Sequence, residues 1–225
     1  MLKFSLPLIS IIFFFISINI FPQGAYLDKG QSGFGIGAAF STNKDISGFG
    51  GSASYCFSGI VDLGLFVGRF SLEEQLAGYD VNAIAISPFI NIYVIKQDED
   101  IPISIAIGGT YESDSYSSEA LDILNWELSG SYFSFGGSIF GNLPISTTGK
   151  IQPSIGVSYV TGESKVEDNS GNSVTSDNNI TNFDIALSLF FKTSSSTFFR
   201  LTPVVAINKD NTTFALGVGA IFSTN

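Results

Sequence analysis

The stretch NFDIALSLFF at residues 182–191 decides the fold, because every second side chain from Phe183 to Phe191 is large and apolar. The side chains between them, such as Asp184, Ala186 and Ser188, are small or polar. This period of two is that of a β-strand and not of a helix. The pattern returns in TFFRLTPVVAI at residues 197–207 and in TTFALGVGAIF at residues 212–222. Each stripe runs for about ten residues, the length that a tilted strand needs to cross a bilayer.

The two faces of these strands differ in a way that decides their orientation. Soluble barrels and sandwiches turn bulky residues inward to fill a core and carry Lys, Glu and Thr outside. Here the second face consists of Gly, Ala and Ser with a few charges. Such a face could neither fill a core nor cover a soluble surface. We therefore expect the large apolar side chains to face lipid and the small and polar ones to face a lumen.

The composition agrees with a membrane barrel. The chain has 225 residues, a mean hydropathy of +0.33 and 13% charged residues, and it has no long apolar run after residue 21. Membrane helices need about 20 consecutive apolar residues, so the short alternating pieces favour strands. From about residue 31 the sequence predicts an all-β fold, an antiparallel transmembrane β-barrel of ten strands. Eight strands is the alternative.

The one long apolar run, at residues 6–21, follows Lys3 and ends in the small residues Gly24 and Ala25. Its length, basic start and small-residue exit are typical of a secretory signal peptide cleaved near Gln23. A retained helical anchor is the alternative. The predicted organisation is a signal peptide at residues 1–23 and one barrel domain at residues 24–225.

Charge and cysteine content exclude some partners. Removal of residues 1–23 takes away only Lys3, so nine basic residues face 20 acidic ones and the net charge is −11. Nucleic acid requires basic patches, so no nucleic-acid partner is expected. Cys56 is the single cysteine, so no intramolecular disulfide can form, and its place in the alternation makes it a small lumen residue.

The length of a connection depends on whether the strand before it has an odd or an even number. The longest polar segments, residues 112–125 and 162–179, follow odd-numbered strands and are expected to be loops at one end of the barrel. Outer-membrane barrels place long loops outside and short turns in the periplasm. The alternation slips near Gly130, which indicates a β-bulge there.

Residues 31–223 resemble a small single-domain outer-membrane β-barrel protein of Gram-negative type. The resemblance rests on the whole-chain pattern and on a closing strand at residues 214–222, where Gly217, Ala220 and Phe222 match the final strand that the assembly machinery recognises in that family. It implies a place in the cell outer membrane, with outer-membrane lipid as the surrounding partner. The acidic outer loops are candidates for contact with an extracellular partner.

The sequence contains no histidine. Outer-membrane barrel enzymes, as families, use His with Ser or Asp, because a general base must titrate near neutral pH. Those mechanisms are excluded, and no enzymatic activity is expected. Residues 168–172 faintly resemble a calcium loop, but their spacing departs from the EF-hand pattern and no bidentate Glu follows. No cofactor or metal is therefore expected.

The candidate functional residues are four lumen charges, Asp62, Asp184, Lys192 and Arg200. If like faces of neighbouring strands meet, Arg200 lies opposite Phe190 and far from the level of Asp184. Arg200 then sits near the periplasmic rim, where Asp62 begins its strand. The hypothesis is a contact between Arg200 and Asp62 across a narrow lumen. The alternative is that each charge is solvated and has no specific partner.

Two functions are consistent with this pattern. Ten strands enclose an interior that side chains and a few waters can fill, far from the 16 to 18 strands of open porins. The first function is a structural or surface-interaction role without catalysis. The alternative is a narrow channel that passes small solutes or ions across the outer membrane.

Overall fold

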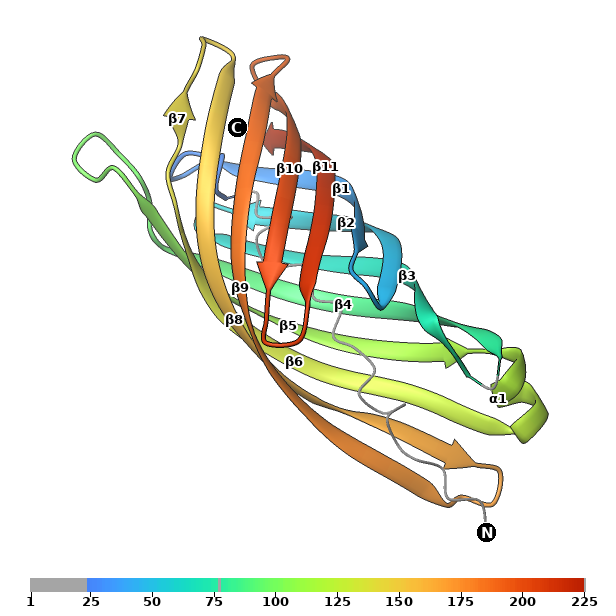
Figure 1. The fold of residues 1–225 in the computed structure, drawn as a ribbon. Coiled ribbons are helices and arrows are strands. Elements are labelled where there is room, and N and C mark those ends of the chain that lie inside the picture. Colours follow the sequence, from blue (N-terminus) through green and yellow to red (C-terminus); the bar gives the residue numbers. More distant parts are fainter. Residues whose placement is uncertain (1–23, 77, 225) are drawn as a thin grey trace.

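The alternating stretches form strands in the structure, a computed structural model that describes residues 24–76 and 78–224. The signal peptide predicted for residues 1–23 lies outside the described residues. Ten long strands follow one another, with one short strand and one short helix between them (Figure 1). In chain order these are β1 (Ser32–Thr42), β2 (Ile46–Phe57), β3 (Val61–Leu76), β4 (Tyr79–Ile95), β5 (Ser104–Ser117), α1 (Glu119–Leu124), β6 (Trp126–Phe140), β7 (Leu143–Pro144), β8 (Gly149–Asp168), β9 (Ser173–Lys192), β10 (Thr197–Ile207) and β11 (Thr212–Thr224).

The ten long strands close on themselves. Each pairs antiparallel with the next along the chain, and β6 pairs with β8 past the two-residue β7. β1 also pairs with β11, from Ser32 opposite Thr224 to Thr42 opposite Phe214. The predicted ten-stranded antiparallel barrel is confirmed, and the alternative of eight strands is wrong. We call the end that carries residue 24 and Thr224 the proximal end and the opposite end the distal end.

The register between strands follows the predicted rule that like faces meet. Arg200 lies opposite Phe190 on β9, as predicted, and opposite Gly219 on β11. A slip of one residue would turn every large apolar side chain of a strand to the other face. The continuous stripes of β9, β10 and β11 therefore set the register.

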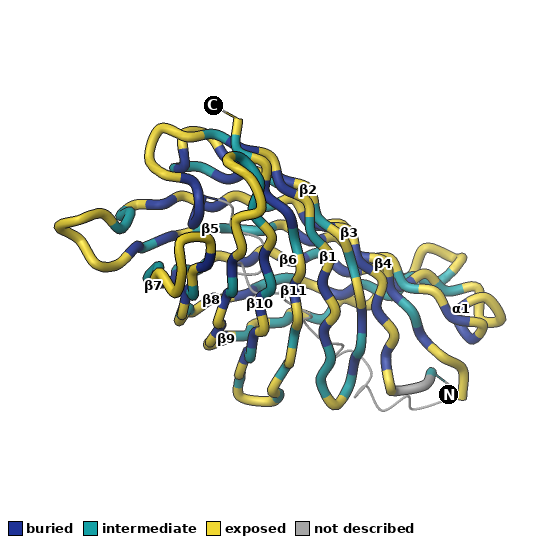
Figure 2. Tube along the Cα trace, turned by 90° about the horizontal axis from the view of Figure 1, so that it is seen from above, coloured by how far each residue is buried: buried dark blue, intermediate teal, exposed yellow. Residues whose placement is uncertain are grey.

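The large apolar side chains in the middle of the barrel point outward. Phe49 is 63% exposed, Phe183 is 61% exposed and Ile155 is 60% exposed, whereas the residues that alternate with them are mostly buried. Figure 2 shows exposed and buried residues alternating along the strands. An outward face this apolar is unsuited to water and suited to hydrocarbon. The predicted orientation of the sheet is thus confirmed.

One inward glycine marks a place where two strands approach closely. A Cβ on Gly136 of β6 would lie 2.3 Å from the carbonyl oxygen of Val157 and 2.8 Å from the Cα of Ser158. Both are backbone atoms and cannot rotate away. We expect Gly136→Ala to lower the free energy of unfolding by about 1–3 kcal/mol. The measurement is urea unfolding in lipid vesicles, followed by the fluorescence of Trp126, the single tryptophan.

The control is Gly51→Ala on the outward face of β2, where the added Cβ would meet its nearest neighbour, the Gly37 carbonyl oxygen, at 3.5 Å. That is ordinary contact, so the change should stay within about 0.5 kcal/mol. Equal effects at the two positions would contradict the close strand approach.

The barrel is taller on one side than on the other. β8 and β9 have 20 residues each, while β1 and β10 have 11 each. The hairpin of β8 and β9 reaches beyond its neighbours at the distal end, near α1 (Figure 1). The prediction that residues 162–179 form a loop is wrong. They continue β8 and β9, and residues 169–172 alone connect the two strands.

β6 has no bulge at Gly130. Gly130 pairs with Asp114 and with Ser164 in an unbroken register, so the predicted bulge is wrong. The slip in the sequence has another cause. From Phe133 to Ile139 the large side chains face outward, but on the distal side of Phe133 the side chains of Tyr132 and Leu128 are buried on the inward face. The apolar residues switch from the outward to the inward face because the distal part of β6 lies beyond the lipid-facing part of the barrel.

Helix α1 (Glu119–Leu124) covers the distal end of the lumen. It is held against β4 and β6, and its Ala120 and Leu121 are buried. The prediction of a loop at residues 112–125 is therefore wrong, since β5 continues to Ser117 and α1 follows. In the part of the chain that the structure describes, no helix is both long and apolar enough to cross a membrane.

Candidate functional site

The proximal end of the lumen is closed by a short segment that precedes β1. Residues 24–27, which we call the plug, are all buried. The ring of Tyr26 packs against Phe190 of β9 at an interplanar angle of 51°, and its centre lies 6.4 Å from the centre of the Phe198 ring. The plug belongs to a buried apolar cluster with residues of seven strands: Cys56, Tyr93, Ala106, Phe140, Phe190, Phe198 and Ile221. This cluster fills the lumen where sequence analysis predicted small residues.

Two charged side chains hold the first residue of the plug. The carboxylate of Asp62, which is 0% exposed, accepts the backbone N–H of Gly24 at 3.1 Å and 3.0 Å from its two oxygens. The hydroxyl of Tyr93 donates to the same carboxylate at 2.7 Å. Lys96 donates to the carbonyl oxygens of Gly24 and Leu27, and to that of Gly59 at 2.8 Å. The plug is thus bound by its backbone.

Lys96 lies in the turn after β4, outside the strands, and is half-buried by the plug. Burial lowers the pKa of Lys96 from its ordinary value, while the nearby Cys56, Asp28 and Asp62 act in the opposite direction. Its three carbonyl partners accept hydrogen bonds from the ammonium group. The side chain therefore joins the plug to the turn between β2 and β3.

An amide network ties the plug to the turn between β6 and β7 and to strand β8. Asn142 donates its side-chain amide to the carbonyl oxygen of Ala25 at 3.1 Å. Gln97 exchanges hydrogen bonds with the backbone of Asn142, at 2.5 Å and 3.0 Å, and Gln152 donates to the Asn142 side chain at 2.9 Å. Buried polar groups are stabilising when they are paired in this way. Several turns of the barrel therefore fix one plug conformation.

A second apolar cluster closes the lumen in its distal half. Its largest inward side chains are Phe66 and Phe70 of β3, with Leu121 of α1 and Leu128 of β6. The other buried members are Ala39, Ile46, Leu72, Val81, Ala83, Ala85, Ala186 and Val204. The lumen is thus filled by side chains at two levels, one near each end.

The four predicted lumen charges occupy different places. Asp62 and Arg200 are buried near the proximal end, and Asp184 is buried at mid-height, where it lines a cavity of about 10 Å³ with Asn91 and Ser158. Lys192 is exposed at the proximal rim, with its ammonium 5.7 Å from the centre of the Phe198 ring.

The contact proposed between Arg200 and Asp62 stays a prediction. The plug lies between the two strands that carry these residues, since Gly24 donates a hydrogen bond to Asp62 and Tyr26 packs against Phe190, the residue opposite Arg200. The plug was not predicted from the sequence. Its signal was the short apolar run Ala25-Tyr26-Leu27 between the predicted cleavage site and the first strand.

Two acidic residues assigned to an outer loop by the sequence are lumen residues instead. Glu112 and Asp114 face inward on β5 and are each 6% exposed. Ser87 donates to Glu112 at 2.8 Å, and Tyr116 donates to Asp114 at 3.3 Å. Across the described residues, no group of three or more His, Cys, Asp or Glu side chains is placed to hold a metal ion.

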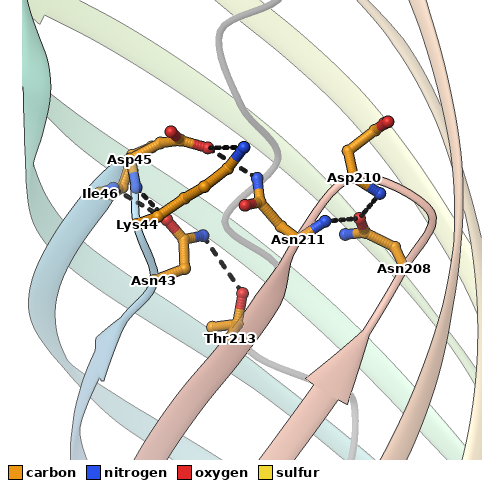
Figure 3. Close-up of polar contacts among 8 residues, drawn as sticks. All are labelled: Asn43, Lys44, Asp45, Ile46, Asn208, Asp210, Asn211 and Thr213. Atoms are coloured by element: carbon orange, nitrogen blue, oxygen red, sulfur yellow. Dashed lines mark hydrogen bonds and ion pairs between the residues drawn. The ribbon is translucent and has the colours of Figure 1, made fainter.

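The distal loops on either side of the β1–β11 seam have the same turn, because both contain Asn-Lys-Asp. The side-chain oxygen of Asn43 accepts hydrogen bonds from the N–H groups two and three residues further on, at 2.8 Å and 2.9 Å. Asn208 does the same at 2.9 Å and 2.8 Å (Figure 3). Asparagine favours tight turns for this reason.

These two loops are also joined to each other. Asn211 donates to the carboxylate of Asp45 at 2.8 Å, and Asn43 donates to the hydroxyl of Thr213 at 3.2 Å (Figure 3). The loops line an open hollow of about 640 Å³. The contacts fix the short side of the distal rim at the place where the barrel closes.

Comparisons with known proteins concern the fold alone. No family model matches the chain, and no curated protein matches it. Among solved structures it is similar to the translocator domain of autotransporter NalP from Neisseria meningitidis, with a TM-score of 0.57 and 11% identity over 86% of this chain and 88% of that chain. It is also similar to the beta domain of the Bordetella autotransporter BrkA (TM-score 0.48, 9% identity, 88% of this chain and 100% of that one). A third similar structure is the outer membrane protease OmpT from Escherichia coli (TM-score 0.43, 8% identity, 87% and 94%).

The closed antiparallel barrel, its apolar outer surface and the likeness to NalP define the class of protein. The chain has the fold of an outer-membrane β-barrel. The expectation that the chain is not an enzyme stays a prediction.

Proposed function

We propose that this protein is an integral barrel of the bacterial outer membrane, exported by a signal peptide, with a closed lumen and a surface-interaction role. Both chain ends of outer-membrane barrels lie in the periplasm, so the proximal end faces the periplasm and the distal end faces outward. The observation that carries the proposal is the filling of the lumen at two levels.

The two closures argue against the alternative of a narrow channel. A permeating ion or solute would have to displace the plug, which is held by Asp62, Lys96 and Asn142, and then pass the apolar cluster around Phe66 and Phe70. Apolar constrictions exclude water and ions. A solute path would therefore need both closures to open.

The distal wall supports a role in surface interaction. We give this name to residues 126–131 of β6, 162–168 of β8 and 173–179 of β9, which lie beyond the lipid-facing band. Its outward face places Glu127 directly opposite Glu167 and Glu163 directly opposite Asp177. Like charges directly opposite one another destabilise a sheet.

One basic residue offsets these charges in part, because Lys165 forms an ion pair with Glu167. The acidic excess that is left would be neutralised by a positively charged partner. The distal wall is therefore suited to a basic protein surface or to divalent cations at the outer leaflet.

We also propose that the protein has no catalytic activity. The sequence has no histidine to act as a general base near neutral pH. The carboxylates Glu112 and Asp114 are buried, and each accepts a hydrogen bond from a neighbouring hydroxyl group. Their placement suits a structural role better than a substrate site.

Planar-bilayer recording tests the closed lumen. The purified native barrel is expected to give no stable single-channel steps, because both ends of the lumen are filled by packed side chains. A porin purified in the same detergent and inserted under the same conditions is the control for insertion and detection. Reproducible steps of one size from the native barrel would overturn the closed-lumen role in favour of the channel.

A further inference from the structure

A hollow of about 210 Å³ lies at the proximal end of the barrel, bordered by the plug and by the barrel wall. We call it the proximal hollow. Its lining combines Tyr26 of the plug and the segment that follows the plug with the turn between β7 and β8 and with residues of β8, β9, β10 and β11. Pockets that hold drug-sized ligands are larger, at about 300–1,000 Å³. The proximal hollow therefore suits a smaller molecule, of the size of a monosaccharide.

Two lysine side chains make the proximal hollow basic. Lys150 of β8 lies opposite Phe190, and Lys192 of β9 lies opposite Phe198. Both lysines lie on the lumen side at the rim, because directly opposite residues share a face of the sheet and the two phenylalanines pack in the proximal cluster inside the lumen. Neither ammonium group forms an ion pair with another described residue. Two such groups on neighbouring strands favour an anionic ligand.

The remaining polar side chains of the lining suit the hydroxyl groups of a sugar. Residues 146–148, Ser195 and Ser223 each carry a hydroxyl group, which can both donate and accept a hydrogen bond. Asp28 adds a carboxylate to the lining. A carboxylate repels an anionic group but accepts hydrogen bonds from hydroxyl groups. The lining therefore favours a molecule that carries hydroxyl groups beside its anionic group.

Three aromatic side chains complete the lining, those of Tyr26, Phe190 and Phe198. Small-molecule sites are lined mainly by apolar and aromatic side chains, with a few polar groups that fix the orientation of the ligand. The C–H face of a sugar ring packs against aromatic rings in this way. The hydroxyl group of Tyr26 is buried and has no hydrogen-bond partner among the residues that the structure describes. Because buried polar groups are normally paired, a ligand with several hydroxyl groups suits this site better than an apolar one.

We propose that the proximal hollow binds a monosaccharide that carries a phosphate or a carboxylate group. Lys150 and Lys192 bind the anionic group by charge-assisted hydrogen bonds. The hydroxyl side chains and Asp28 bind the sugar hydroxyl groups, and the aromatic side chains pack against the ring. With the orientation proposed above, the site faces the periplasm, at the opposite end of the barrel from the distal wall.

A ligand in this position would also stabilise the closed proximal end. Tyr26 belongs to the plug, while Lys150 and Lys192 belong to the wall, so a bound sugar contacts both. A ligand that binds only the folded state stabilises that state by mass action. The link to closure rests on the closed lumen proposed above, whereas binding itself does not.

The first test is isothermal titration calorimetry of the native barrel, purified from outer membranes in detergent. We expect one molecule of glucose 6-phosphate or of glucuronate to bind per barrel, because each carries an anionic group on a sugar ring. Glucose lacks the anionic group and inorganic phosphate lacks the ring, so each should bind about tenfold more weakly or less. The proposal would be overturned if neither anionic sugar bound, or if glucose or inorganic phosphate bound as tightly as they do.

The second test removes the two ammonium groups one at a time. Lys150→Gln and Lys192→Gln are each expected to weaken binding of the anionic sugar about tenfold or more, the size expected for a lost hydrogen bond to a charged group. Lys29→Gln is the control, because Lys29 is exposed near the same end but does not line the hollow. Its effect should be less than about threefold. Equal losses in all three variants would indicate unspecific attraction of anions and would contradict the site.

A third measurement needs no variant. The native barrel is unfolded by urea in lipid vesicles with and without the anionic sugar, and the fluorescence of Trp126 reports unfolding. At ten times the dissociation constant measured by calorimetry, the apparent equilibrium constant for unfolding should fall about tenfold. Glucose at the same concentration is the control for effects of the solvent. An equal effect of glucose would overturn the site, whatever the conductance recordings show about the lumen.

Discussion

Ile185→Arg is expected to lower the free energy of unfolding in lipid vesicles by about 2–4 kcal/mol, the cost of an arginine on the lipid face near the bilayer midplane. Ile185 lies in the middle of β9, and its side chain is 58% exposed on the outward face. In a soluble barrel an exposed position would accept arginine within about 0.5 kcal/mol. Urea unfolding in vesicles, followed by the fluorescence of Trp126, measures the difference.

The matched control is Ser173→Arg, on the same face of the same strand but in the distal wall. Ser173 is exposed and lies opposite Glu167, so an arginine there should change the free energy of unfolding by less than about 0.5 kcal/mol. A small cost at both positions would show that Ile185 meets water. The lipid-facing orientation of the sheet would then be wrong, and the outer-membrane proposal with it.

The lipid-facing half of the fold was predictable, because a strict alternation of apolar and polar residues leaves few alternatives for the orientation and pairing of the strands. Phe183, Ile185 and Leu187 share one face of β9, and Asp184 and Ala186 share the other. Once neighbouring strands must match their faces, the pairing of Arg200 with Phe190 follows without coordinates. The strand count, the antiparallel closure and the direction of the apolar face all follow from this local rule.

The distal half of the barrel was not predictable from the same rule, because there large side chains face the lumen and polar side chains face outward. Tyr132 and Leu128 are also large side chains, yet they point into the lumen. Nothing in the sequence marks the height at which lipid ends, so the exchange resembles a bulge. For the same reason the polar residues 162–179 resemble a loop, although residues 162–167 pair with residues 173–178 across the hairpin as strand residues do.

The plug was missed for a different physical reason. Asp62 and Arg200 could be identified as lumen charges from their positions in the alternation. When partners are sought among charged side chains alone, these two residues are paired with each other. The partner that the structure adds to Asp62 is the backbone of Gly24, 38 residues away in sequence. Backbone donors carry no sequence signal, and residues 24–27 are too short to have a period.

Phe190→Ala is expected to lower the free energy of unfolding by about 3–5 kcal/mol, the range for truncating a buried phenylalanine. Phe190 is 2% exposed, and Tyr26 packs against its ring. Truncation leaves a cavity that the surrounding strands cannot close, because their hydrogen-bonded ladders hold them apart. It also removes the surface that positions the plug. Urea unfolding in vesicles measures the loss, and protease sensitivity of the segment before β1 should increase in the same variant.

Phe191→Ala is the control, because the adjacent side chain is 47% exposed and faces lipid. Its truncation leaves no enclosed cavity, so only the transfer of the ring between water and hydrocarbon is lost, about 1.5–3 kcal/mol. The segment before β1 should keep its native protease resistance in this variant. If the two substitutions had equal effects on unfolding and on proteolysis, Phe190 would not be packed against the plug. The proximal closure would then rest on hydrogen bonds alone, and the lumen could open without unfolding the barrel.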